Sequence, residues 1–143
     1  MALKKEHLAG CVIYRNDPED GKIKYLVMKK FKGFWEFSKG HADEGENPAE
    51  TAKRELKEET SLINVSFKSG FEKKLAYVTK NDEGIVVEKN VTYFIGITKQ
   101  TKIILSDEHL EYRWLGYDEA RELVTFNTLK ILLDEVNRFL TRK

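Results

Sequence analysis

The sequence predicts an α+β fold in which a mixed β-sheet is sandwiched between α-helices (α/β/α). Strand-like apolar runs, separated by turn residues, fill most of residues 8–98. The last part of the chain changes to the apolar spacing of amphipathic helices. One helix-like segment, residues 48–60, interrupts the strands. A sheet with one inserted helix and further helices after it is typical of layered α+β architectures.

The strands are expected in two pairs. "LAGCVIYR", residues 8–15, is followed by the turn "NDPEDGK" and by a second strand, "IKYLVMKK", at residues 23–30. Two longer runs, residues 65–79 and 84–98, flank the turn "KNDEG", which favours a β-hairpin. Helices are expected at residues 117–124 and 127–143. The second has an apolar stripe formed by Leu129, Leu132, Leu133, Val136 and Leu140.

Length and composition restrict the class of protein. The chain has 143 residues, which fits a single domain spanning 1–143. A formal net charge of +1 argues against binding a long nucleic acid, which requires a basic face. No apolar segment approaches the ~20 residues needed to span a membrane, and the first ten residues lack the apolar stretch of a signal peptide. We therefore expect a cytoplasmic protein, with its one cysteine, Cys11, as a small core residue.

The inserted helix has clear signals at its start. Asn47 is a good N-cap, and Pro48 suits the first helical position. At about 100° per residue, Ala49, Ala52 and Leu56 fall on one stripe, which we expect to be buried against the sheet.

Three glutamates form a neighbouring stripe of the same helix. Glu55, Glu58 and Glu59 repel one another at this spacing, and the helix dipole adds to the cost near the C-terminus. A divalent cation would reverse these terms, and hard carboxylate oxygens suit Mg²⁺ or Mn²⁺. Gly40 and Gly45 allow the preceding segment to turn sharply and approach a ligand. The alternative is a solvated acidic face without a ligand.

The spacing around this helix is distinctive. Gly40 is followed by five residues and Glu46, and then by seven residues and "RELKEETSL", which begins at Arg54. This matches the Nudix hydrolase signature except at its last glycine, where the chain has Ser61. The chain therefore resembles a Nudix hydrolase over its whole length, and the family fold is a mixed sheet between helices. A serine at this helix end would either cost roughly 1 kcal/mol in the left-handed conformation or make the helix end differently.

Within that family, three segments are similar to the asymmetrical diadenosine tetraphosphate (Ap4A) hydrolases: "FWEFSKGHADEGE", "LAYV" and "LSDEHLEYRWLGYDEARELVTF". Such enzymes cleave Ap4A into ATP and AMP, and they usually have proline where this chain has Ser38. Hydrolysis of nucleoside triphosphates or RNA 5′-triphosphate ends is an alternative, because RNA pyrophosphohydrolases share the "E…RW" pattern. A non-catalytic nucleotide-binding sensor is a third, against which the complete glutamate set argues.

The resemblance implies roles for the acidic residues. Glu55, Glu58 and Glu59, with the carbonyl of Gly40, would hold the metal ions. A further carboxylate would come from Glu108, with Glu111 as the alternative three residues on. Either Glu58 or Glu59 would accept the proton of the attacking water.

The resemblance also implies roles in substrate binding. Arg54 would hold the glutamates in place rather than contact the substrate. Lys39 would bind phosphate, and His41 would either bind phosphate or pack. Tyr77 and Phe126 match positions at which these hydrolases stack an adenine between two rings, although either ring could instead belong to the core.

Overall fold

The computed structural model describes residues 3–142. In chain order its elements are β1 (Lys4–Asn16), β2 (Ile23–Lys30), β3 (Trp35–Glu36), β4 (Ser38–His41), α1 (Pro48–Thr60), β5 (Ser66–Phe67), β6 (Lys73–Lys80), β7 (Val86–Ile97), β8 (His109–Leu115), α2 (Tyr117–Leu123) and α3 (Asn127–Thr141).

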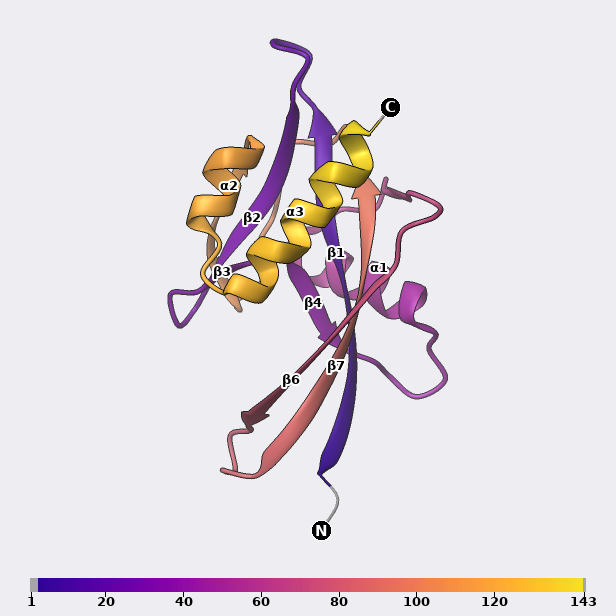
Figure 1. The fold of residues 1–143 in the computed structure, drawn as a ribbon, viewed down its shortest axis with the longest axis vertical. Helices are drawn as coiled ribbons and strands as arrows, with labels where there is room; N and C mark the ends of the chain where they lie inside the picture. Colours follow the sequence, from indigo (N-terminus) through magenta and orange to yellow (C-terminus); the bar gives the residue numbers. More distant parts are fainter. Residues whose placement is uncertain (1–2, 143) are drawn as a thin grey trace.

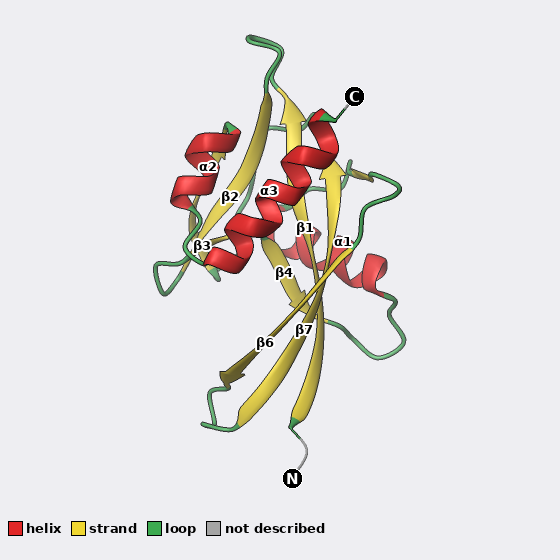
Figure 2. Cartoon of the chain, viewed as in Figure 1, coloured by secondary structure: helices red, strands yellow, loops and turns green. Residues whose placement is uncertain are grey.

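The strands form one mixed sheet around β1. β1 pairs in parallel with β7, from Lys4 opposite Val87 to Tyr14 opposite Ile97, and antiparallel with β2 and β4. β3 and β8 pair with β2, and β5 and β6 with β7. Helices α2 and α3 cover one face of the sheet and α1 the other (Figures 1 and 2). The predicted α/β/α class is confirmed.

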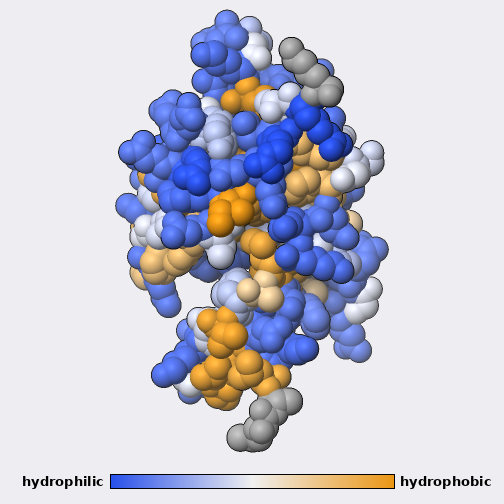
Figure 3. All heavy atoms as spheres, in the orientation of Figure 1, coloured by the Kyte–Doolittle hydropathy of each residue, from blue (hydrophilic) through white to orange (hydrophobic). Residues whose placement is uncertain are grey.

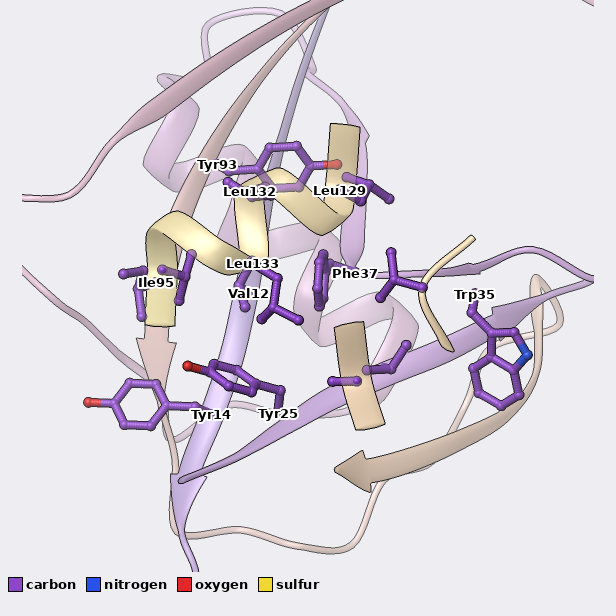
Figure 4. Packing of buried hydrophobic residues seen from close by; sticks show 14 of the residues in the cluster. Val12, Tyr14, Tyr25, Trp35, Phe37, Tyr93, Ile95, Leu129, Leu132 and Leu133 are labelled. Atoms are coloured by element: carbon purple, nitrogen blue, oxygen red, sulfur yellow. The ribbon is translucent and has the colours of Figure 1, made fainter. Parts of the chain in front are cut away.

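The core has two parts because β1 alternates between the two faces of the sheet. Val12 and Tyr14 point toward α3, where Leu132 and Leu133 are fully buried (Figure 4). Cys11 and Ile13 point the other way, against Leu56 of α1 and its neighbours. Cys11 is 1% exposed, as expected for a core cysteine. The site helix α1 is therefore anchored by its own apolar layer.

Several predicted elements differ in detail. Residues 65–79 were expected as one strand, but the chain leaves the sheet between β5 and β6, where Gly70 has a positive φ of 88°. Five residues there lie opposite only two of β7, because Phe67 pairs with Gly96 and Lys73 with Tyr93. The short strands β3 and β4, and strand β8, were not predicted. The expected hairpin between β6 and β7 is confirmed.

The surface is largely polar in the view of Figure 3, with an apolar patch at the lower end, where Figure 1 places the β6–β7 hairpin. Exposed apolar residues of that hairpin include Val78, Ile85 and Val86. Within residues 3–142, no helix has both the length and the apolar character needed to cross a membrane.

Candidate active site

Helix α1 begins as predicted and is rotated slightly from its expected orientation. The Asn47 side chain accepts a hydrogen bond from the Glu50 backbone N–H, and Glu50 accepts one from the Asn47 N–H, which completes a capping box. Ala52 and Leu56 are buried, but Ala49 is only half-buried. The buried face extends instead to Glu59, because the end of the helix packs against β1 and β4. The sequence-based stripe was therefore wrong at Ala49.

The other end of α1 shows how the chain accommodates Ser61. This residue has φ 65° and ψ 14°, the left-handed conformation in which glycine is usual, and its N–H donates to the Lys57 carbonyl. Among residues 3–142 it is the one non-glycine residue with positive φ. The helix thus ends as a glycine-terminated helix would, at a cost of roughly 1 kcal/mol.

Glu59 is the most deeply buried of the three glutamates, with 2% of its surface exposed. Its Oε1 accepts hydrogen bonds from the Ser38 hydroxyl at 2.6 Å and from the Lys39 backbone N–H at 3.2 Å. Burial raises the pKa of Glu59 to about 8; the negative charges of Glu36 and of other nearby carboxylates add to the rise, and the Ser38 hydrogen bond opposes it.

Glu55 of α1 lies directly against Gly40, which is in strand β4 before the helix. A Cβ atom built on Gly40 would be 2.0 Å from the Glu55 carboxyl carbon, so only glycine fits at this position. Burial raises the pKa of Glu55, and the charges of Glu58 and Glu108 raise it further, while Arg54 acts in the opposite direction. The Glu55 carboxylate and the Gly40 backbone therefore share one small space.

Arg54 connects the acidic side chains. Its Nε donates to Glu46 at 2.7 Å, and its Nη1 donates to Glu55 at 2.9 Å and to Glu58 at 3.2 Å. Its Nη2 donates to the His41 carbonyl oxygen at 2.8 Å. These bonds connect the segment from His41 to Glu46 with the helix, and they offset the repulsion between the glutamates.

In this arrangement, no group of three or more carboxylate, imidazole or thiol side chains between residues 3 and 142 is placed to hold a metal ion. Arg54 binds Glu55 and Glu58, and Glu58 is more than half exposed. The donor chemistry nevertheless fits a divalent ion. The negative charge of Glu55 helps to raise the pKa of Glu59, and the Glu55 carboxylate lies directly against Gly40, so hard oxygen donors are available here.

Of the two candidates for the further carboxylate, Glu108 is better placed. It lies just before β8, and its negative charge raises the pKa values of both Glu55 and Glu59. Glu111 instead lies on β8 and forms a 3.6 Å ion pair with Arg113. The structure therefore brings Glu108, rather than Glu111, toward the glutamates of α1.

The residues expected to bind substrate lie around the same sheet. His41 Nε2 is 2.9 Å from Glu6 Oε1, so its exposed ring already has a partner. Lys39 is close enough to Lys89 for its charge to help lower the pKa of that amine, after the larger effect of burial. Tyr77 is 37% exposed and lies opposite Lys89 in the β6–β7 register.

Phe126 belongs to the segment before α3 and not to the hairpin that carries Tyr77. It precedes α3, is 45% exposed, and packs against Phe34 with ring centroids 5.1 Å apart. Thr125 beside it donates its backbone N–H to the Trp35 carbonyl. Phe126 is therefore accessible to a ligand from the side of β3, where it shares its surface with Phe34.

The chain can be compared with known proteins. The family model described as "NUDIX domain" matches residues 5–134. The chain belongs to the Nudix family. The helix that carries Arg54, Glu55, Glu58 and Glu59 is thus the Nudix helix, and enzymes of this family need divalent metal ions.

Individual members of the family are similar to this chain over nearly its whole length. The chain is 36% identical to an asymmetrical bis(5′-nucleosyl)-tetraphosphatase from Mus musculus, over 98% of this chain and 97% of that protein. A crystal structure of a C. elegans Ap4A hydrolase in a binary complex superposes with a TM-score of 0.83 at 28% identity, covering 94% and 97% of the two chains. An RNA pyrophosphohydrolase from Sulfurovum sp. is 25% identical, over 95% of this chain and 92% of its own.

Three residues of the candidate site were not predicted from the sequence. Glu36 and His109 are buried beside Glu59, and Lys89 faces Tyr77 across the hairpin. Two signals were available. Glu36 is a lone charge inside the apolar run "FWEF", and counting outward from the turn "KNDEG" pairs residue 77 with residue 89.

Proposed function

We propose that this Nudix hydrolase cleaves dinucleoside tetraphosphates asymmetrically, converting Ap4A into ATP and AMP with Mg²⁺ or Mn²⁺ as the metal. The observation that carries the chemistry is the position of the Glu55 carboxylate against Gly40, beside the buried Glu59. The names of the mouse and C. elegans relatives support the substrate.

In this proposal, Glu55, Glu58, Glu59 and Glu108 would hold the metal together with the Gly40 carbonyl. When bound, a divalent ion lowers the pKa of water and neutralises charge that develops on the phosphates. Glu58 or Glu59 accepts the proton of the attacking water. Arg54 keeps the loop and the helix in register through its bonds to Glu46 and the His41 carbonyl.

The polyphosphate is proposed to cross β4 and β7. Lys39 lies close enough to Lys89 for its charge to help lower the pKa of the Lys89 amine, and two such neighbouring cations can neutralise phosphates. Tyr77, opposite Lys89, offers its exposed ring to one adenine, and such a stack contributes ~1–3 kcal/mol. Phe126 would cover the other side of that base or receive the second base beside Phe34.

The products test this substrate assignment. Ap4A is incubated with the protein and Mg²⁺ in ¹⁸O-labelled water, and the nucleotides are separated and weighed by mass spectrometry. We expect ATP and AMP in equal amounts, with the label in one of them. Two ADP molecules as the sole products would contradict asymmetric cleavage.

A second candidate is the removal of pyrophosphate from RNA 5′-triphosphate ends, which the similarity to the Sulfurovum RNA pyrophosphohydrolase favours. A direct competition distinguishes the two. Ap4A and a short 5′-triphosphorylated RNA are supplied together at equal concentrations, and kcat/KM is obtained for each. A higher value for the RNA would replace the dinucleotide with the RNA end as the substrate.

A further inference from the structure

We propose that Glu36, Ser38 and His109 form a buried frame that sets the orientation of the Glu59 carboxylate, and that they are positioning residues for the hydrolysis. This inference rests on the proposed role of Glu59 as metal ligand or base. It concerns three side chains that do not themselves contact the metal or the substrate.

The frame and Glu59 are almost completely excluded from solvent. Exposed fractions are 5% for Glu36, 2% for Ser38, 2% for Glu59 and 5% for His109. Charged and polar side chains are rarely buried to this extent unless they are paired. Four of them in one cluster, at the end of the Nudix helix, therefore call for an explanation beyond packing.

Each oxygen of the Glu59 carboxylate faces a different member of the frame. Oε1 accepts the Ser38 hydroxyl at 2.6 Å, and Oε2 lies 3.9 Å from His109 Nδ1. The terminal torsion of a glutamate is broad and is not fixed by the chain itself. The hydrogen bonds at Oε1 limit its rotation, and His109 lies on the side of Oε2.

His109 is held in place from its other side. Its Nε2 lies 3.3 Å from Glu36 Oε2, across β2, because Glu36 pairs with Met28 and His109 with Lys30. Its Nδ1 is buried and has no hydrogen-bond partner. The nitrogen thus points at Glu59 about 1 Å beyond bonding distance, where a small rotation of the carboxylate would satisfy it.

Stability alone does not account for the frame. A buried polar pair such as Glu36–His109 contributes little net stability, and well-packed apolar residues of similar volume often replace such pairs without loss. Partners that orient metal-binding carboxylates, in contrast, typically change metal affinity or activity by 10–100-fold when mutated. The frame has the geometry of such orienting partners, because Ser38 and His109 lie next to Glu59 and Glu36 holds His109 from its other side.

Two substitutions at one position separate the two nitrogens of His109. Asparagine places its amide near the position of Nδ1 and keeps a polar group toward Glu59, whereas glutamine places its amide near Nε2 and keeps one toward Glu36. We expect His109→Asn, which loses only the contact to Glu36, to lower kcat less than His109→Gln does. We expect His109→Gln to lower kcat by ~10–100-fold with little change in the KM for Ap4A.

Metal binding gives a readout that does not depend on activity. The melting temperature is measured against Mg²⁺ concentration for each variant. For His109→Gln, the concentration that gives half of the rise should increase by about 10-fold or more, and for His109→Asn it should increase by less. Tyr25→Phe, which removes the buried hydrogen bond to Asn137 away from the site, is the matched control and should leave both kcat and this concentration unchanged.

Ser38 is tested by loss and by rescue. Ser38→Ala removes the hydroxyl and should lower kcat by ~10-fold or more, and Ser38→Thr, which keeps the hydroxyl, should recover most of it. If Ser38 acts only through Glu59, adding Ser38→Ala to Glu59→Gln should cause no further loss.

The outcomes distinguish the frame from the proposed function. Wild-type kcat and metal response in both His109→Gln and Ser38→Ala, with an inactive Glu59→Gln, would overturn the frame and leave the function standing. Equal losses in His109→Asn and His109→Gln, accompanied by a lower metal-free melting temperature, would show that His109 is structural, and this too would overturn it. Full turnover of Ap4A by Glu59→Gln would overturn the frame and the proposed role of Glu59, and would leave the substrate assignment standing.

Discussion

The Glu55 carboxylate occupies the space that a side chain at Gly40 would fill, with 2.0 Å between its carboxyl carbon and a Cβ built at residue 40. This contact joins strand β4 to the Nudix helix. We expect Gly40→Ala to displace Glu55 and to lower kcat by at least ~10²-fold, the scale of a lost metal ligand. Gly116→Ala, at a position before α2 with an ordinary φ of −63° and nothing within 4 Å of the new Cβ, is the control for a glycine-to-alanine change. Wild-type turnover by Gly40→Ala would show that the Glu55 position is unimportant.

Removal of divalent ions should abolish turnover, because a bound divalent ion would lower the pKa of the attacking water and neutralise charge that develops on the phosphates. Activity is measured after dialysis against a chelator and again after Mg²⁺ or Mn²⁺ is added back. Metal at 100 times its Kd should also stabilise the fold by about 2.7 kcal/mol, seen as a rise in Tm. Turnover that persists in the chelated protein would sink the metal mechanism.

Glu59→Gln should lower turnover by at least ~10²-fold and raise the stability of the metal-free protein. Burial raises the folded-state pKa of Glu59 to about 8, above its ordinary value of 4.5. The unfolded chain therefore loses this proton first as the pH rises, and folding stability falls between about pH 4.5 and pH 8. In a chelating buffer, the gain in Tm from Glu59→Gln should accordingly be larger at about pH 8 than at about pH 5. An equal gain at both values would mean that Glu59 titrates normally.

Tyr77→Ala should act mainly on the KM for Ap4A, because stacking is similar in the ground and transition states. A lost stack of order 1.4 kcal/mol corresponds to roughly a 10-fold increase. Val78→Ala, at the next and more exposed position of β6, serves as the control. Steady-state kinetics that show a lower kcat and an unchanged KM for Tyr77→Ala would move this residue from base binding to another role.

Ser61→Gly should stabilise the protein, because Ser61 has a left-handed backbone conformation that costs a non-glycine residue roughly 1 kcal/mol. For a chain of this length, that gain corresponds to an increase in Tm of about 3 °C. Ser61→Ala, which keeps the backbone cost and loses only the 3.4 Å contact to the Ile104 carbonyl, should not be more stable than wild type. Thermal melts of the three proteins give the comparison.

The sequence predicted those features that depend on local periodicity and spacing. β2, the N-cap at Asn47 and the β6–β7 hairpin follow from patterns within a few residues, and the match to the Nudix signature identified the acidic helix before its geometry was known. The burial of Glu59 was not predicted, because it depends on Ser38 and His109, which approach it from distant strands. Contacts between residues far apart in the chain produce no periodic pattern in the sequence.

The β6–β7 hairpin carries Tyr77 and Lys89, whereas the acidic groups of the candidate site lie on α1 and just before β8. Among the described strands β6 pairs only with β7, and its turn at residues 81–84 lies at the lower end of the sheet, beside the start of β1 (Figure 1). Changes in that turn therefore alter few contacts with the Nudix helix. In evolutionary terms, nucleobase preference can drift in the hairpin while the bond-breaking machinery stays under separate selection, so an exchange of residues 73–90 with a relative is a direct route to new substrate choice.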